Sequence, residues 1–179
     1  MRRSWTLPRG LTALAAGLVV VLGGAVAAET KVELKGVHLC CGACVKGVAT
    51  ALKGVEGVTA KCDRPKSTVS LTATDEAAAR KALDALGAAG YFGESSDKAL
   101  TIKPGAASAG KVKTVTLAGV HNCCGRCNSA IKAAVKKAAG VTGETVKVNA
   151  ETFTVTGDFS PEDVVKSLNA AGFNATVKD

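Results

Sequence analysis

Aromatic residues are scarce in this chain, which has one Trp, one Tyr and four Phe among 179 residues. Proteins that bind single-stranded nucleic acid usually stack bases on aromatic side chains, and this chain has few to offer. Its basic charge comes from Lys spread along the chain, for example Lys46, Lys81 and Lys136, as on solvated helix faces. The composition therefore predicts no nucleic-acid partner.

The chain also lacks a long apolar run, because residues 11–22 fall short of the roughly 20 residues that a membrane-spanning helix needs. That run follows a basic start with Arg2 and Arg3 and precedes the small-x-small pattern Ala25-Val26-Ala27, as in a secretory signal peptide. We expect residues 1–28 to be cleaved, leaving a periplasmic or secreted chain without stable membrane insertion. The alternative is an uncleaved anchor. Cleavage would remove Arg2, Arg3 and Arg9 and no acid, lowering the formal charge from +8 to +5.

Cysteine and histidine, in contrast, are concentrated in two short windows that repeat each other. Six of the seven Cys and both His lie in Gly36-Val37-His38-Leu39-Cys40-Cys41-Gly42-Ala43-Cys44 and in Gly119-Val120-His121-Asn122-Cys123-Cys124-Gly125-Arg126-Cys127. The repeat continues downstream, where Ala88-Ala89-Gly90-Tyr91 is matched by Ala170-Ala171-Gly172-Phe173. Between the two units, residues 104–111 contain a Pro/Gly/Ala/Ser stretch typical of a flexible linker, with no sign that the units must dock.

Within each unit the spacing of apolar residues switches between the two-residue period of a strand and the longer period of a helix. Residues 31–35 alternate as in a half-buried strand, and Cys44, Val48, Leu52 and Val55 then recur at helical spacing until Gly57. Two more strands follow at 58–62 and 68–72, and a helix runs from Asp75 to about Gly87. Ser160 and Pro161 mark the start of its counterpart, as N-cap and first helical residue. The last strand is clear at 173–177 and blurred between 91 and 102. This order predicts an α+β fold with two tandem ferredoxin-like βαββαβ domains, residues 29–103 and 112–179.

Each Cys window lies between a strand and the first turn of a helix, where free N–H groups favour an anion. Cys44 and Cys127 are there expected to ionise readily, and the thiolate is the form that binds metal or attacks a disulfide. A Cys-x-x-Cys pair alone is a weak signal, but two copies at the same place in a repeat indicate metal binding. In an oxidising compartment the alternatives are a thiol–disulfide redox protein and a disulfide-stapled interaction module.

These motifs resemble the heavy-metal-associated (HMA) domain family, which includes copper chaperones, mercury carriers and the amino-terminal domains of metal-pumping ATPases. The resemblance implies a metal carrier rather than an enzyme, with Cys41, Cys44, Cys124 and Cys127 as primary ligands. It also implies transfer by thiolate exchange to a metal-transporting ATPase or another HMA domain. Two domains on a flexible linker raise the further hypothesis that both loops share one metal ion or that one loop loads the other. Tyr91 and Phe173 match an aromatic that lies near the metal loop in bacterial relatives, although core packing explains them equally well.

The loops depart from the family pattern in ways that bear on the metal. The usual Met is replaced by Leu39 and Asn122, and each pair is preceded by an extra Cys, Cys40 or Cys123. With His38 or His121 these form a Cys3His set that suits Zn(II), whereas two or three sulfurs alone suit Cu(I). We expect Cu(I) first, Zn(II) next, with Hg(II) also open. Because side chains alternate in an extended loop, Cys40 is expected to point away from Cys41. Cys62 is expected to be a core thiol, and Arg126 a solvated charge.

Overall fold

The computed structural model describes residues 28–178. The expected signal peptide, residues 1–28, therefore lies outside the described residues apart from Ala28. Within the described part of the chain, no helix has the length and apolar character needed to cross a membrane.

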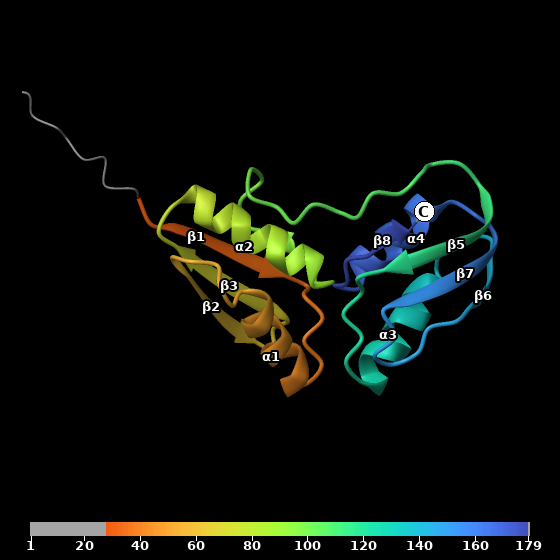
Figure 1. Ribbon diagram of the computed structural model, residues 1–179, viewed down its shortest axis with the longest axis horizontal. Coiled ribbons are helices and arrows are strands. Elements are labelled where there is room, and N and C mark those ends of the chain that lie inside the picture. Colours follow the sequence, from red (N-terminus) through yellow and green to blue (C-terminus); the bar gives the residue numbers. More distant parts are fainter. Residues whose placement is uncertain (1–27, 179) are drawn as a thin grey trace, which may run out of the picture.

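The first half of the chain forms a four-stranded antiparallel sheet with two helices (Figure 1). Its sheet order is β2-β3-β1-β4, so β3 lies between the two strands that α1 connects. Strand β1 alternates buried and more exposed residues, as the sequence predicts. The elements in chain order are β1 (Thr30–Lys35), α1 (Gly42–Ala51), β2 (Val58–Asp63), β3 (Thr68–Ala73), α2 (Glu76–Ala88) and β4 (Glu94–Ser95).

The second half has the same order of elements and the sheet order β6-β7-β5-β8. This arrangement of two antiparallel sheets and four helices is consistent with the ferredoxin-like fold expected from the sequence. The elements are β5 (Val112–Ala118), α3 (Gly125–Val135), β6 (Val141–Glu144), β7 (Thr152–Phe159), α4 (Pro161–Ala170) and β8 (Thr176–Lys178).

Helix boundaries follow local signals at some ends and depart from the prediction at others. Asp75 caps α2, its side chain accepting a hydrogen bond from the Ala78 N–H at 2.7 Å. Ser160 occupies the N-cap position of α4, with Pro161 next, but its side chain makes no capping hydrogen bond. The prediction that the first helix continues to Gly57 is wrong, because α1 ends at Ala51 and the next residues form turns.

The cores lie between the helices and one face of each sheet. Small Ala side chains on α2, such as Ala79 and Ala82, pack beside Leu83 and Leu86, so the first core is thin, as expected from the sequence. In the second half, Phe153 and Phe159 from β7 add bulk. The fully buried residues of both cores include Leu34, Val69, Leu83, Leu117, Ile131, Val155, Val164 and Leu168.

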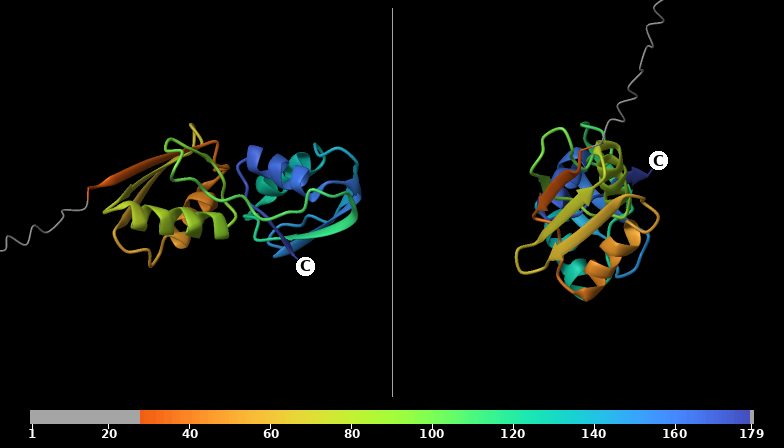
Figure 2. Two further views of the ribbon diagram at one scale, coloured as in Figure 1. Left: turned by 90° about the horizontal axis from the view of Figure 1, so that it is seen from above. Right: turned by 90° about the vertical axis from the view of Figure 1, so that its left-hand side faces the viewer.

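The two halves lie side by side along the long axis and dock where their Cys loops meet (Figures 1 and 2). Tyr91 and Phe173 form an antiparallel bridge across the junction. The Asn174 N–H donates to the Gly90 carbonyl at 2.9 Å, and the Phe92 N–H donates to the Gly172 carbonyl at 3.2 Å. A Cβ on Gly90 would lie 2.2 Å from the backbone nitrogen of His121, and one on Gly172 would lie 2.4 Å from the backbone nitrogen of His38. The backbones therefore approach closely because both positions are Gly.

This docking explains why the last strands are shorter than expected. Strand β8 begins at Thr176 rather than at Phe173, because Phe173 and Asn174 pair with the other half. The segment 104–111 also makes contacts with the second half, since the Val177 N–H donates to the Ala106 carbonyl at 3.4 Å and the Glu162 N–H to the Ser108 carbonyl at 3.3 Å. Its expected flexibility stays a prediction.

Candidate metal centre

The two Cys loops are positioned by the first turns of α1 and α3. Cys41 and Cys124 are the N-cap residues of these helices, in extended conformation. Cys44 and Cys127 lie one turn further on and are fully buried. Cys40 and Cys123 precede the caps and are half-buried. Each loop therefore brings three sulfurs to the end of its helix that faces the junction between the halves.

The six loop sulfurs form one cluster that crosses this junction. All seven cysteines are free thiols, and the sulfurs in contact are 3.5–3.9 Å apart. Contacts between the halves are as short as those within a loop: Cys40 Sγ lies 3.5 Å from Cys127 Sγ and 3.6 Å from Cys44 Sγ. The pairs between halves are Cys40–Cys124, Cys40–Cys127, Cys41–Cys123, Cys41–Cys124, Cys44–Cys123 and Cys44–Cys127.

The sulfur spacing fits a metal ion held by thiolates. A zinc–sulfur bond of about 2.3 Å corresponds to sulfurs about 3.8 Å apart at the corners of a tetrahedron. The observed distances of 3.5–3.9 Å match this spacing and far exceed the roughly 2.05 Å of a disulfide bond. In chemistry and in spacing, the donor set therefore suits a soft metal ion.

Each loop His packs against the aromatic residue of the opposite half. The His38 ring stacks on Phe173 with centroids 4.3 Å apart, and the His121 ring stacks on Tyr91 at 4.4 Å. The Tyr91 hydroxyl donates to the Cys44 carbonyl at 2.8 Å and lies 3.2 Å from His121 Nε2. His38 Nε2 is buried with no hydrogen-bond partner among the described residues. Burial lowers the pKa of both imidazoles, which favours the neutral form that binds metals.

These histidines extend the sulfur cluster to mixed donor sets. Ligand atoms of Cys44, His121, Cys123 and Cys127 all lie within 4.8 Å of one another, as do those of His38, Cys40 and Cys127 and those of Cys40, Cys41 and Cys124. Every one of these sets contains residues from both halves. A metal ion bound in any of them would therefore join the two halves.

The thiols differ in how readily they ionise. Burial raises the pKa of Cys40 and of Cys123 to about 12. Cys124 is half-buried at the N-terminus of α3, where the backbone N–H groups of Cys127 and Arg126 stabilise the thiolate and lower its pKa to about 6. Burial raises the pKa of Cys127, so the expectation that this residue ionises readily is wrong in the absence of metal. The pKa of Cys44 is lowered, because hydrogen bonds to its sulfur outweigh the effect of burial.

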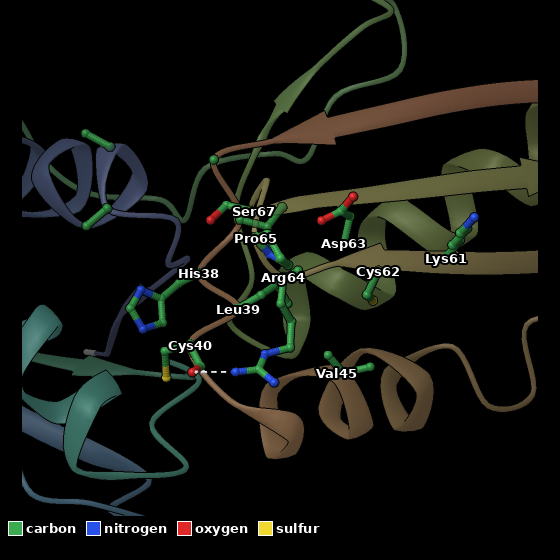
Figure 3. A pocket seen from close by; sticks show the side chains of 14 residues that line it. His38, Leu39, Cys40, Val45, Lys61, Cys62, Asp63, Arg64, Pro65 and Ser67 are labelled. Carbon is green, nitrogen blue, oxygen red and sulfur yellow. Dashed lines mark hydrogen bonds between the residues drawn. The ribbon is translucent and has the colours of Figure 1, made fainter.

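Two guanidinium groups lie at the edge of the cluster, one from each half. Arg64 and Arg126 both donate to the Cys40 carbonyl, each at 3.2 Å. Figure 3 shows Arg64 reaching past Leu39 to this carbonyl, beside an open pocket that His38 and Cys62 also line. Arg126, expected to be a solvated charge, is exposed but also makes this bond across the junction. Both groups place positive charge where thiolates would gather.

The structure brings all eight candidate ligands predicted from the sequence together at one place, which is the arrangement that the hypothesis of one metal ion shared by both loops requires. The expectation that Cys40 points away from Cys41 is wrong: both sulfurs approach Cys44 Sγ, at 3.6 and 3.7 Å. The chain turns into α1 at Cys41, so the alternation of an extended strand does not apply. Cys62 is half-buried on β2, packs against the core and does not belong to the cluster.

The residues that dock the loops were not predicted from the sequence. Gly90, Gly172 and Asn174 hold the backbones together, and Tyr91 and Phe173 each support the His of the other half. One signal was present in the sequence, because Ala-Ala-Gly followed by an aromatic residue occurs at the end of both units. The pattern identified an aromatic near a metal loop, but not that each aromatic stacks on the His of the opposite half.

Substitution of the usual Met by Asn122 has a structural role. Asn122 is 9% exposed, and its side-chain amide donates to the Lys147 carbonyl at 3.0 Å and to Asn128 Oδ1 at 3.2 Å. The backbone carbonyl of Asn122 accepts a hydrogen bond from the Asn149 N–H at 2.9 Å. Asn122 therefore ties the second loop to the segment before β7, whereas Leu39 is buried in the apolar core.

Comparison with known proteins supports a metal-binding role for the second half. Residues 108–174 match the family described as "Heavy-metal-associated domain". No curated protein matches the chain. Among solved structures, the solution structure of the N-terminal soluble domains of Bacillus subtilis CopA is similar, with 18% identity, a TM-score of 0.32, and coverage of 85% of this chain and 95% of that one. The family match and the thiol cluster together support binding of a soft transition-metal ion through cysteines.

Proposed function

We propose that this protein binds a soft transition-metal ion between its two halves and buffers it or passes it to a partner. The observation that carries the proposal is the cluster of six free sulfurs, spaced 3.5–3.9 Å apart across the junction. Cu(I) is the favoured ion, ahead of Zn(II) and Hg(II), because thiolates outnumber all other donors and no carboxylate belongs to the sets formed by the described residues.

The proposal treats the first half as a second HMA-like domain in tandem with the matched one. Supporting observations are the shared order of strands and helices, the same sheet order and the same position of the Cys loop before the first helix. The basic and apolar N-terminal sequence supports export to the periplasm or beyond, where such a carrier would receive or deliver metal. Its role is then that of a carrier and not of an enzyme.

Metal transfer would proceed by exchange of thiolates at the exposed edge of the cluster. Cys41 and Cys124 line an open pocket together with Gly125, Arg126 and Ser129, whereas Cys44 and Cys127 are fully buried. An incoming thiolate from a partner would therefore replace Cys41 or Cys124 first, and the buried pair would release the ion last. A partner with a matching Cys loop, such as a metal-transporting ATPase or another HMA domain, has the required chemistry.

Zn(II) is the second candidate cargo, and one observation favours it. Cys44, Cys123 and Cys127 lie 3.7–3.8 Å apart, and a His121 ring nitrogen completes a Cys3His set. Three sulfurs and one nitrogen are typical of tetrahedral zinc. His121→Ala would therefore weaken Zn(II) binding strongly and Cu(I) binding little.

The test is native mass spectrometry of the mature protein under anaerobic conditions, before and after reduction, with Cu(I) and Zn(II) added separately. We expect the reduced protein to bind metal, with Cu(I) displacing Zn(II), and to lose binding when Cys41, Cys44, Cys124 and Cys127 are replaced by Ser. Cys62→Ser is the matched control and should bind as the unaltered protein does. A protein that arrives with disulfides, resists reduction and takes up no metal would contradict the proposal and favour a redox or disulfide-stapled role.

A further inference from the structure

The contacts among the six sulfurs of the cluster link them in the way that the corners of an octahedron are linked. In that arrangement the opposite corners are Cys40 and Cys123, Cys41 and Cys127, and Cys44 and Cys124. Every other edge measures 3.5–3.9 Å, except the two that join adjacent residues, Cys40–Cys41 and Cys123–Cys124. Six corners in this arrangement form eight triangular faces, and each face offers three thiolates to one ion.

The triangles that are complete at 3.5–3.9 Å all contain sulfurs from both halves. They are Cys40–Cys124–Cys127, Cys40–Cys44–Cys127, Cys41–Cys44–Cys123 and Cys44–Cys123–Cys127. An ion at the centre of such a triangle would lie about 2.1–2.2 Å from each sulfur, close to a metal–thiolate bond of about 2.3 Å. Every triangle that is already complete therefore lies where the halves meet.

An octahedron of sulfurs has no corner set that makes a tetrahedral four-sulfur site, because any four corners include an opposite pair. The geometry thus disfavours an ion that requires four thiolates and favours one that accepts three. Cu(I) is a soft ion that thiolate ligands select. The sulfurs alone therefore favour Cu(I), whereas Zn(II) would need the mixed set that includes His121.

From this geometry, and resting on the proposed function, we propose that the junction binds four Cu(I) ions as one copper–thiolate cluster. The ions occupy four alternate faces, and each of the six thiolates bridges two of them. Two of these faces are complete triangles, and the other two close when Cys40 and Cys41 share one ion and Cys123 and Cys124 share another. Six S–H bonds break, their protons pass to solvent and twelve copper–sulfur bonds form, with no change in oxidation state. Four monovalent cations and six thiolates leave a net charge of −2.

The charges at the edge of the cluster fit this product. Arg64 from the first half and Arg126 from the second both donate to the Cys40 carbonyl at 3.2 Å, so two guanidinium groups lie beside a cluster with a charge of −2. Such pairing stabilises an anion in a partly buried site. A single Cu(I) held by two thiolates would leave a charge of −1 and four thiols unused.

The test is an anaerobic titration of the full mature chain with Cu(I), followed by native mass spectrometry and X-ray absorption. We expect the apo and four-copper forms to coexist with little of the one- to three-copper forms, because the ions share ligands. The absorption spectrum should show three sulfurs per copper and a copper–copper distance shell. A protein that stops at one or two ions, or shows no copper–copper shell, overturns the cluster while leaving metal binding intact. A protein that binds no metal overturns both proposals.

A variant of one loop separates a shared cluster from two independent sites. Replacing Cys40, Cys41 and Cys44 together by Ser removes three corners of the octahedron, and we expect at most one of the four ions to remain. Two independent loops would instead retain half of the copper, which would overturn the proposal. Circular dichroism checks that the variant is folded, and Cys62→Ser, outside the cluster, should still bind four ions.

Discussion

The two Cys loops have the same skeleton but are held in place by different chemistry. Tyr91 stacks on His121 across the junction and also donates to the carbonyl of Cys44 in its own half, whereas its counterpart Phe173 has no hydroxyl and only stacks on His38. The second loop instead has Asn122, which ties it to its own half, and Arg126, which reaches the first loop. The differences show that equivalent residues of a repeat acquire separate roles once the two copies dock.

The same asymmetry appears in the thiols. The pKa of Cys44 is lowered and that of Cys127 is raised, although both occupy the first turn of a helix. Burial opposes ionisation at both sulfurs; at Cys44 it is outweighed by hydrogen bonds, chiefly from Cys41 and Cys40 of its own loop, whereas at Cys127 contacts with Cys40 and Cys44 of the other half add to it. The position in the first helical turn therefore does not decide the pKa alone. Two isolated loops would be much more alike. Variants that separate the halves, or that exchange one support for another, should therefore test this comparison directly.

Gly172→Ala is expected to have the largest effect, because it separates the halves. A Cβ at Gly172 would lie 2.4 Å from both the Gly36 carbonyl oxygen and the His38 nitrogen. Both atoms belong to the backbone, which cannot yield as a flexible side chain does. We expect the loops to move apart and Cu(I) affinity to fall on the order of a hundredfold. The two loops would then be held near each other only by the chain that links the halves, and they would no longer be positioned to share an ion. Competition with a Cu(I) chelator and small-angle scattering measure the two effects.

Gly36→Ala is the matched control. Gly36 has a φ of +75° and Gly172 a φ of +86°, so both substitutions carry the cost of a left-handed Ala, about 1 kcal/mol. No atom lies within 4 Å of a Cβ at Gly36. If Gly36→Ala lowered copper affinity as much as Gly172→Ala, backbone strain and not the docked junction would be responsible.

The next largest effect on Cu(I) affinity should separate the two fully buried thiols from the two half-buried ones. Cys44 and Cys127 belong to most of the complete sulfur triangles and are fully buried, whereas Cys41 and Cys124 lie at the open pocket. We expect Cys44→Ser and Cys127→Ser to weaken Cu(I) binding roughly tenfold more than Cys41→Ser and Cys124→Ser, about 1.4 kcal/mol. Chelator competition measures this order. Equal losses for all four would indicate two separate Cys-x-x-Cys sites.

Asn174→Ala tests the support that only the second half provides. Asn174 is 5% exposed, and its side chain bonds the Gly87 carbonyl, the Lys103 carbonyl and the Gly105 N–H at 3.1–3.2 Å. Removing it leaves buried groups unpaired, so we expect the free energy of unfolding to fall by about 1–3 kcal/mol. Urea denaturation of the apo protein measures the change. Asn169→Ala is the control, since Asn169 Oδ1 is buried without a partner among the described residues, and it should cost less.

The fold of each half could be predicted from the sequence because its signals are local. Alternation defines β1, Asp75 and Ser160 mark helix starts, and the Cys loops lie before α1 and α3 as expected. Helix ends were less predictable, since Leu52 and Val55 keep a helical spacing while forming turns after α1. Local apolar periods identify an element but do not determine where it stops.

The joining of both loops in one candidate metal centre was only a hypothesis from the sequence, because it depends on contacts between residues far apart in the chain. Tyr91 meets Cys44 and His121, and Gly172 meets His38, through the packing of two complete sheets. Neither half contains a pattern that differs from that of a free domain. Even the repeat favours two equal sites, since nothing in one loop indicates that its Cys residues face those of the other.

Tyr91→Phe is expected to have a moderate effect on stability. The hydroxyl of Tyr91 donates to the Cys44 carbonyl at 2.8 Å, and the side chain is 1% exposed. Without it a buried carbonyl loses its partner, so the free energy of unfolding should fall by about 1–2 kcal/mol. The variant would give the first half the same aromatic residue that the second half has at Phe173. Chemical denaturation measures the loss, and a change below about 0.5 kcal/mol would mean that stacking on His121 alone holds the loop.

Arg126→Ala should have the smallest effect, because Arg64 donates to the same carbonyl of Cys40 and remains in place. Arg126 is exposed, so its charge acts through solvent and is screened by salt. We expect uptake of Cu(I) from an anionic chelator complex to slow roughly two- to threefold at low ionic strength and to be unchanged at high salt. Lys136→Ala removes the same charge at the other end of α3 and is the matched control. Stopped-flow measurement of copper uptake should show a smaller change for Lys136→Ala, because distance from the cluster weakens its attraction. Equal slowing by both variants would assign the effect to net charge, and the position of Arg126 at the junction would then have no role in metal uptake.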